Sequence, residues 1–200
     1  MSLRETKKLR TREAIASEAM RLFATRGFDH VTVAEIAVAA GVSEKTVFNY
    51  FPTKEDIFFD EVPARLESLA TALRGRKPGE SIFAVLRGLQ SRDAPRLTSE
   101  RFATFARILE ESHALQAKEL EIMGHFADML AATLQSELGV KEIDAAVAAN
   151  ALVSVQWQFF RNARRAALEG KTGPAAEKKL RADLSRAYTL LEHGLGALES

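Results

Sequence analysis

Cysteine is missing from all 200 residues of the chain, which excludes disulfide bonds, thiolate metal sites and cysteine nucleophiles. Long apolar runs are missing too, since no stretch approaches the roughly 20 apolar residues that a membrane-spanning helix needs. Residues 1–12 are polar and basic and contain no apolar segment of the kind that a secretion signal requires. We therefore expect a cytoplasmic protein that has no membrane partner.

The residues of catalysis and cofactor binding are also sparse. The sequence has no Gly-rich phosphate loop. The histidines lie far apart, without the spacing of metal ligands: His30, His113, His125 and His193. One charged group, residues 110–113, is expected to be a solvated helix end. The sequence thus predicts no catalytic residue, no metal and no cofactor, and it argues against an enzyme.

What the sequence does have is an uneven distribution of charge. Apolar residues make up 46% of the chain, enough for the core of one large domain or two small ones. Residues 1–54 hold nine Lys and Arg against six acids, a net charge of +3, which leaves −2 for the rest of a chain whose total is +1. A basic head on a nearly neutral body is typical of polyanion binding, although this imbalance is small.

A stretch beginning at Thr32 contains two short helical patterns separated by a glycine. Thr32 and Glu35 have the spacing of a capping box, which starts a helix. Gly41 can take the left-handed conformation that ends this helix and turns the chain. Ser43 caps the next helix, and Pro52 ends it, because the residue before a proline is pushed out of helical geometry. Two helices joined in this way form a helix-turn-helix, whose second helix fits the DNA major groove.

The flanking segments on either side of this motif have different roles. We expect residues 1–12 to be a mobile arm, either a solvated tail or an arm that follows DNA phosphates or enters the minor groove. Residues 11–26 carry apolar residues at helical spacing and predict a bracing helix. After the motif, residues 54–74 predict a connector helix that Pro63 should kink or divide. We therefore assign residues 1–53 to DNA binding and 54–200 to a second domain.

The sequence of the second domain predicts helices throughout. No alternating strand pattern of useful length occurs, so the fold class is all-α, and residues 93–97, which include Pro95, are expected to break a helix. After the connector, the expected helices are 80–92, one opened by Thr98, 115–138, 141–168 and 174–198.

The helix expected at residues 141–168 has apolar residues on two opposite sides, so two surfaces must cover it. The last helix adds a stripe that includes Leu184 and Leu191, and this hairpin could pair with its own copy in a four-helix interface. Burial of the helix within one monomer is the other interpretation. Dimerisation through the last two helices is favoured, because two major-groove helices about one DNA turn apart require a two-fold partner.

Three ordered runs of sequence resemble the DNA-binding head of the tetracycline-repressor (TetR) family: R-L-F-A-T-R-G-F at 21–28, T-V-A-E-I-A-V-A-A-G-V-S at 32–43 and T-V-F-N-Y-F-P-T-K-E-D-I-F at 46–58. The resemblance covers roughly the first quarter of the chain. It implies a sequence-specific DNA-binding regulator, most simply a homodimeric repressor released from a palindromic operator by a small ligand. Beyond about residue 74 only the general plan of the family is similar, a variable helical domain that binds a ligand and dimerises.

The resemblance places the recognition helix at residues 43–51. Glu44 and Lys45 then face base edges, where Lys donates to guanine and Glu accepts from cytosine. Glu44 is equally suited to compensating the helix dipole. Asn49 either reads adenine or faces solvent.

The same resemblance implies phosphate contacts for Thr46, Tyr50 and Lys54, and one from the cap residue Thr32. Phe48 departs from the family, which usually has a tyrosine there, so one phosphate contact lacks its hydroxyl. The predicted DNA-binding residues are Thr32, Ser43, Glu44, Lys45, Thr46, Asn49, Tyr50 and Lys54.

Aromatic residues and methionines in the second domain could line a ligand pocket, although such stripes are more often plain core. They would suit an apolar or amphipathic effector, with Asn150 or Gln156 adding polar contacts. The predicted ligand-binding residues are Phe102, Phe105, Met123, Phe126, Asn150, Trp157 and Phe160. Two alternatives are a DNA-tethered protein that docks another protein without any small ligand, and a helical-bundle enzyme with a vestigial head, which would need a convergent polar cluster.

Overall fold

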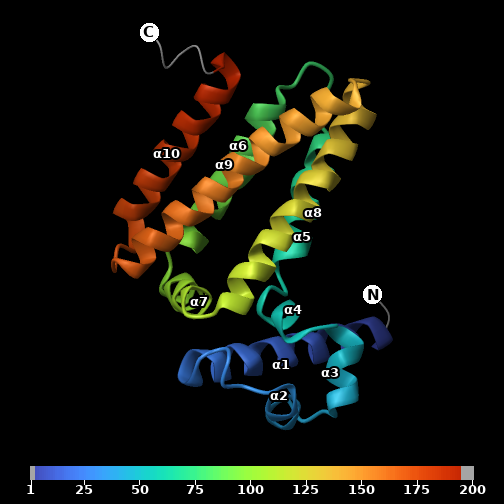
Figure 1. Ribbon diagram of the computed structural model, residues 1–200, viewed down its shortest axis with the longest axis vertical. Coiled ribbons are helices and arrows are strands. Elements are labelled where there is room, and N and C mark those ends of the chain that lie inside the picture. The colour runs from blue at the N-terminus through green and yellow to red at the C-terminus, as the bar shows by residue number, and fades with distance from the viewer. Residues whose placement is uncertain (1–2, 195–200) are drawn as a thin grey trace. The chain divides into compact units, whose positions relative to one another are not determined.

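The computed structural model describes residues 3–194, and within this range the chain forms ten α-helices and no strand (Figure 1). This confirms the all-α prediction. The helices are α1 (Leu3–Arg26), α2 (Val33–Ala39), α3 (Glu44–Tyr50), α4 (Lys54–Phe58), α5 (Val62–Arg74), α6 (Ile82–Leu97), α7 (Glu100–Glu110), α8 (His113–Leu138), α9 (Glu142–Leu168) and α10 (Gly173–His193). None of those in the described range combines the length and apolar character needed to cross a bilayer.

The chain divides into two compact units. The first unit joins residues 1–63 with residues 107–118, which form the corner between α7 and α8. The second unit contains residues 64–106 and 119–200. The segment 107–118 therefore packs with the helix-turn-helix region, although it follows that region by more than forty residues in the sequence.

Helix α1 is longer than its apolar pattern predicts. The expected mobile arm is wrong from Leu3 onward, because α1 begins there and continues without interruption to Arg26. The segment has no Gly or Pro and is rich in Arg, Lys, Glu and Leu, whose high helix propensity extends a helix without any apolar face. Met1 and Ser2 lie outside the described residues. Three fully buried side chains on α1 face the other helices of the first unit: Ile15, Ala19 and Phe23.

The expected connector is divided into α4 and α5. The chain leaves helical geometry after Phe58 and re-enters it at Val62, so Pro63 is the second residue of α5. Proline is tolerated in the first helical turn, where its missing N–H would have no partner within the helix. The proline therefore separates two short helices, which is one of the two outcomes that the sequence predicts.

Two expectations for the second unit are wrong: the helix break at residues 93–97, and the start of the next helix at Thr98. Helix α6 continues through Pro95 to Leu97 instead of breaking at residue 93. Ala94 and Leu97 are completely buried, and packing of this last turn outweighs the loss of one helix hydrogen bond. Thr98 ends α6, where its hydroxyl donates to the Ala94 carbonyl at 3.0 Å, whereas Ser99 opens α7 by accepting from the Phe102 N–H at 3.2 Å.

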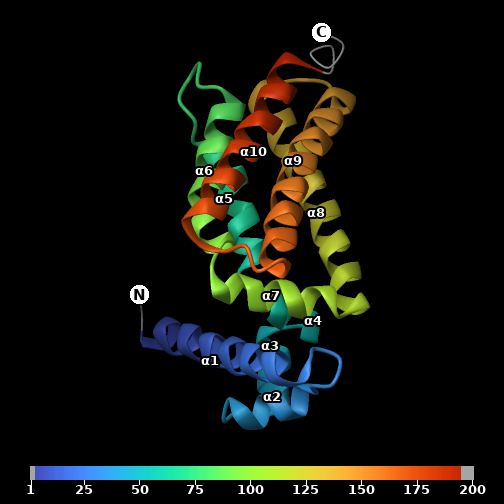
Figure 2. The ribbon, with the colours of Figure 1, turned by 90° about the vertical axis from the view of Figure 1, so that its left-hand side faces the viewer.

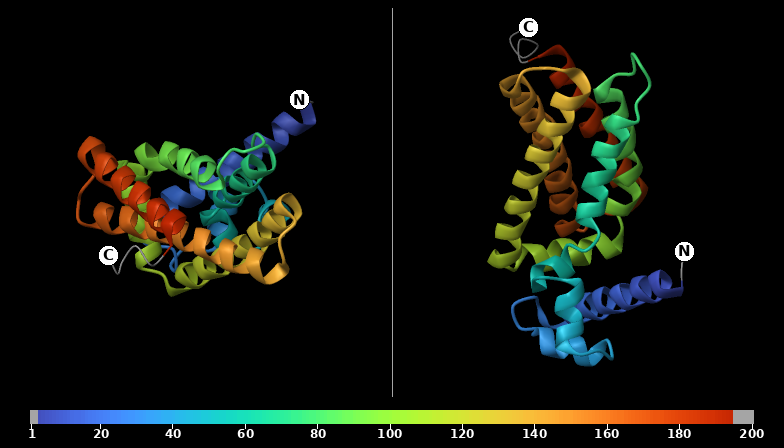
Figure 3. Two further views of the ribbon diagram at one scale, coloured as in Figure 1. Left: turned by 90° about the horizontal axis from the view of Figure 1, so that it is seen from above. Right: turned by 90° about the vertical axis from the view of Figure 1, so that its right-hand side faces the viewer.

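Helices α9 and α10 form an antiparallel hairpin, and α10 also packs against α6 (Figures 2 and 3). Leu180, Leu184 and Tyr188 are the buried side chains of α10. The Tyr188 hydroxyl donates to the Gln90 amide oxygen of α6 at 3.0 Å, inside the core, and burial raises the pKa of this tyrosine. Helix α10 ends at His193, and residues 195–198 of its expected range lie outside the described residues.

Candidate nucleic-acid interface

Helix α2 begins with a complete capping box. The Thr32 hydroxyl accepts from the Glu35 N–H at 3.3 Å, while Glu35 accepts from the Thr32 N–H at 2.8 Å and from its hydroxyl at 2.9 Å. The Arg26 guanidinium lies 2.7 Å from the same carboxylate. The backbone hydrogen bond from Thr32, followed by the Arg26 bond, lowers the pKa of Glu35 to about 2. Glu35 is therefore ionised and committed to the start of α2.

The corner between α2 and α3 is a Schellman motif. The Val42 N–H donates to the Ala37 carbonyl at 2.9 Å, and the Gly41 N–H donates to the Val38 carbonyl at 3.1 Å. Gly41 has a φ of +66°, in the left-handed region that favours glycine. A side chain at residue 41 would meet no neighbour within 4 Å, so the backbone conformation alone requires this glycine.

Helix α3 presents one buried side chain and an exposed outer face. Ser43 caps the helix by accepting from the Thr46 N–H at 3.1 Å, and the two hydroxyl oxygens lie 2.8 Å apart. Val47 is 1% exposed and holds the helix against the first unit. The predicted base-reading residues Glu44, Lys45 and Asn49 are all exposed. The outer face therefore has an acid, a base and an amide available for contact with base edges.

The other predicted DNA-binding residues differ in how accessible they are. Thr46 and Tyr50 are half-buried, whereas Phe48 is 50% exposed on the same outer face. The side chain of Lys54 turns inward: its Nζ donates to the Phe28 carbonyl at 3.0 Å and to the Val31 carbonyl at 2.9 Å. The ammonium group of Lys54, which the resemblance implies for phosphate contact, is therefore bonded within the first unit.

Arg12 is a residue of this region that sequence reasoning did not single out. Its Nε donates to Asp60 at 2.6 Å, its Nη1 donates to the Tyr50 carbonyl at 3.1 Å, and its guanidinium carbon lies 4.4 Å from the centre of the Phe51 ring. A sequence signal existed, because residue 12 precedes the buried Ile15 by three positions and so shares its helix face. The expectation of a mobile arm at residues 1–12 left residue 12 outside the helical pattern.

The α7–α8 corner is tied to the same unit by two polar contacts. The Ser112 hydroxyl, which is 2% exposed, donates to Asp29 at 2.8 Å. The Lys118 ammonium lies 3.2 Å from Asp56, the capping-box residue of α4. Residues of the α7–α8 corner therefore contact the loop before α2, at Asp29, and the first turn of α4, at Asp56.

The predicted ligand-binding residues are only partly brought together. Phe102, Phe105 and Phe160 form a cluster with ring centres 5.3–6.2 Å apart. Elsewhere in the second unit, Phe126 is buried, while Met123 and Trp157 are half-buried. Asn150 is exposed, and its amide donates to the Ala146 carbonyl of its own helix at 2.9 Å. Gln156 is 7% exposed, and its amide oxygen has no hydrogen-bond partner.

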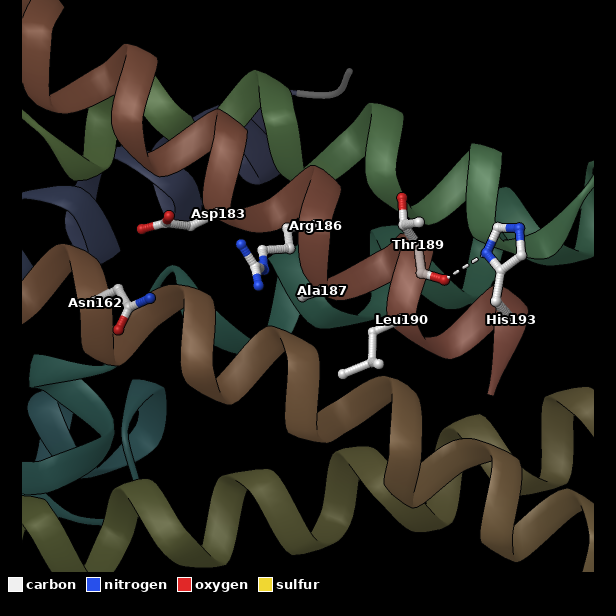
Figure 4. A pocket seen from close by; sticks show the side chains of 7 residues that line it. All are labelled: Asn162, Asp183, Arg186, Ala187, Thr189, Leu190 and His193. Atoms are coloured by element: carbon white, nitrogen blue, oxygen red, sulfur yellow. Dashed lines mark hydrogen bonds between the residues drawn. The ribbon is translucent and has the colours of Figure 1, made fainter. Parts of the chain in front are cut away.

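A separate groove of about 470 Å³ lies between α9 and α10 (Figure 4). Most of its lining residues carry a polar or charged group, although the wall itself is mainly carbon. The Nδ1 of His193 lies 2.8 Å from the Thr189 carbonyl. The lining residues are Asn162, Asp183, Arg186, Ala187, Thr189, Leu190 and His193. The part of the chain that the structure describes has no group of three or more His, Asp and Glu side chains that could hold a metal ion.

The chain is similar to known transcriptional regulators. The family model for "Bacterial regulatory proteins, tetR family" matches residues 15–60. HTH-type transcriptional regulator TcmR of Streptomyces glaucescens is 36% identical over 86 residues, which are 43% of this chain and 38% of TcmR. The chain thus spans well under half of that relative's length.

Two solved structures resemble the whole fold. NalD, the secondary repressor of the MexAB-OprM multidrug efflux pump in Pseudomonas aeruginosa, has a TM-score of 0.59 at 20% identity and covers 92% of this chain and 96% of its own. The Thermus thermophilus repressor FadR, solved in complex with lauroyl-CoA, has a TM-score of 0.52 at 25% identity and covers 90% of this chain and 92% of its own. The family match and the helix-turn-helix geometry identify residues 15–60 as a DNA-binding segment of the tetR type. The solved structures show that the all-helical fold of the chain is shared with such regulators.

Proposed function

We propose that the chain is a homodimeric repressor that binds a palindromic DNA operator and is released from it by a small apolar or amphipathic ligand. The observation that carries this proposal is the outer face of α3, where Glu44, Lys45 and Asn49 are exposed on a helix fixed by its cap and by the buried Val47. Regulators of this family are transcription factors, and we place this one in the cytoplasm with the DNA that it reads.

Base reading and phosphate contact would come from different residues. Lys45 would donate to guanine, Glu44 would accept from cytosine, and Asn49 would bind adenine. Ser43, Thr46 and Tyr50, at the edges of this face, would contact phosphates and fix the helix in the groove. Thr32 would join them only by exchanging Glu35 for a phosphate, because its single hydroxyl proton is donated to that carboxylate.

The proposed dimer forms through α9 and α10. Ile143 and Val147, one turn apart on α9, are 66% and 63% exposed, which is unusual for large apolar side chains unless a partner covers them. Asp183 and Arg186 place both signs of charge in the groove beside α10, which suits a self-complementary surface. A two-fold dimer would present two α3 helices to successive major grooves.

The proposed effector site lies among the aromatic side chains of the second unit, with its centre at Phe102, Phe105 and Phe160. The buried, unpartnered amide oxygen of Gln156 lies one helical turn from Phe160 and would accept a hydrogen bond from the effector. The proposed site includes Phe102, Phe105, Met123, Phe126, Asn150, Trp157 and Phe160.

Functionally, residues 1–53 would form the DNA-binding domain and residues 54–200 the ligand-binding and dimerisation domain. The compact units differ from this division, since α4 and the α7–α8 corner belong to the unit that contains the helix-turn-helix. Ser112 and Lys118 in this corner contact Asp29 and Asp56. Ligand binding that moved the corner would therefore change the positions of the helices in the DNA-binding domain.

The test is a gel-shift series with operator fragments that the purified protein itself selects. An effector should weaken operator binding, and operator DNA should weaken effector binding by the same factor, because the coupling is reciprocal. If operator affinity is unchanged at saturation with every ligand that binds the protein, release by a ligand is wrong. That result would favour the alternative in which the helical domain docks another protein.

A further inference from the structure

The side chain of Lys54 bonds to backbone groups inside the first unit. An ammonium group has three N–H donors, and two of them bond to the Phe28 and Val31 carbonyls at 3.0 and 2.9 Å. The same nitrogen lies 4.1 Å from the centre of the Phe28 ring, within range of a cation–π interaction. That ring packs against Phe23 and Phe58, with centres 4.9 and 6.2 Å away. Lys54 therefore caps the aromatic core of the first unit and has one donor left.

The two carbonyls belong to the loop that leads into the helix-turn-helix. Phe28 and Val31 are 3% and 1% exposed, and Thr32, the cap of α2, follows Val31 directly. Holding both carbonyls on one nitrogen fixes the course of this loop. The orientation of α2, and of α3 joined to it by the Gly41 corner, therefore depends on a cation that comes from α4.

Arg12 makes the corresponding contact at the other end of the motif. Tyr50 is the last residue of α3, and its carbonyl is one of the helix-terminal acceptors that lack a partner within the helix. Arg12 donates to this carbonyl at 3.1 Å, and a cation at a helix C-terminus is favoured by the helix dipole. Asp60 and the Phe51 ring hold the guanidinium in place.

We propose that Lys54 and Arg12 are positioning residues, which orient α2 and α3 before DNA arrives, and that Lys54 is not a phosphate ligand. The inference rests on DNA binding by α3 and does not depend on the identity of an effector. A phosphate ligand and a positioning residue affect DNA affinity by different physical routes. Neutralising a phosphate releases counterions and steepens the salt dependence of binding, whereas preorganisation lowers the cost of binding equally at every salt concentration.

The experiment compares Lys54→Met with Lys45→Met, a matched change on the exposed face of α3. Operator affinity is measured across a series of salt concentrations on one duplex selected by the wild type, at a temperature where circular dichroism shows each protein folded. Lys54→Met should weaken binding roughly tenfold at every salt concentration, with an unchanged slope of log K against log [salt]. A fall in the slope of about 0.9 for each protomer, or about 1.8 for the dimer, would show a lost phosphate contact and overturn the proposal.

Amide hydrogen exchange of the DNA-free protein supplies a readout that a phosphate ligand would not change. Exchange at residues 28–36 should accelerate in Lys54→Met and remain as in the wild type in Lys45→Met. An unchanged exchange rate at residues 28–36 in Lys54→Met would overturn the proposal. A lower melting temperature of this variant with full operator affinity would also overturn it, because Lys54 would then contribute to stability alone. If Lys54→Met does not fold, Lys54→Gln and Arg12→Lys take its place. If the wild type binds no operator, the proposed function has failed, and the exchange comparison still decides whether Lys54 orders the loop.

Discussion

Replacing Thr32 with alanine removes one hydroxyl from the start of α2, and the structure determines what is lost. The hydroxyl oxygen accepts from the Glu35 N–H at 3.3 Å and donates to the Glu35 carboxylate at 2.9 Å. Both bonds are absent in Thr32→Ala, while the bond from the Thr32 N–H to Glu35 remains possible. Loss of a threonine cap typically costs about 1 kcal/mol, within a range of roughly 0.5–2 kcal/mol.

Thermal denaturation in the absence of DNA measures this cost. For a chain of this size, about 1 kcal/mol corresponds to a fall in melting temperature of roughly 2–4 °C. Thr32→Ser is the matched control, because it retains the hydroxyl and should melt within about 1 °C of the wild type, given that Ser and Thr are similar caps. Equal melting temperatures for Thr32→Ala and Thr32→Ser would refute the assignment of the cap. A second measurement, operator affinity, should fall in the alanine variant and be retained in the serine variant.

Three further predictions concern pH, the core and the DNA-facing surface. Because the pKa of Glu35 is lowered from 4.5 to about 2, its contribution to stability is present above about 4.5 and is lost as the pH falls towards 2. The melting temperatures of wild type and Glu35→Gln should therefore converge over that range, and a constant difference would contradict the assignment. Tyr188→Phe leaves the buried Gln90 oxygen unpaired and should cost about 1–3 kcal/mol in urea denaturation; an unchanged midpoint would refute this cost. Phe48→Tyr adds a hydroxyl to the exposed face of α3 and should raise operator affinity roughly tenfold in gel shifts, whereas no gain would mean that residue 48 lies away from phosphate.

The caps and corners of the head could be predicted from the sequence because their partners are local. Thr32, Ser43 and Thr53 each accept from an N–H three residues later, so a pattern of a few residues contains the whole interaction. Gly41 is equally local, since its conformation follows from ending one helix and beginning another. The exposure of Glu44, Lys45 and Asn49 follows from the burial of Val47 on a single helix face.

The bonding partners of the long cationic side chains could not be predicted in this way. Lys54 bonds to carbonyls 26 and 23 residues earlier, and Arg12 bonds to one 38 residues later. A flexible side chain can reach outward to a phosphate or inward to a carbonyl, and tertiary neighbours decide which. The same reason explains Pro95, where burial of the neighbouring Ala94 and Leu97 maintains a helix that local rules would end. The joining of residues 107–118 to the head is likewise a tertiary property without a local signal.

We propose that two copies of the chain place their α3 helices in successive major grooves, and DNA selection with the purified protein tests this proposal most directly. The account predicts an enriched inverted repeat whose half-sites are about 10–10.5 base pairs apart, or a multiple of that spacing, bound by two protomers. Selection with Lys45→Ala should change the preferred base at one position in each half-site. Enrichment of no sequence, or of a single half-site bound by one protomer, would contradict the account.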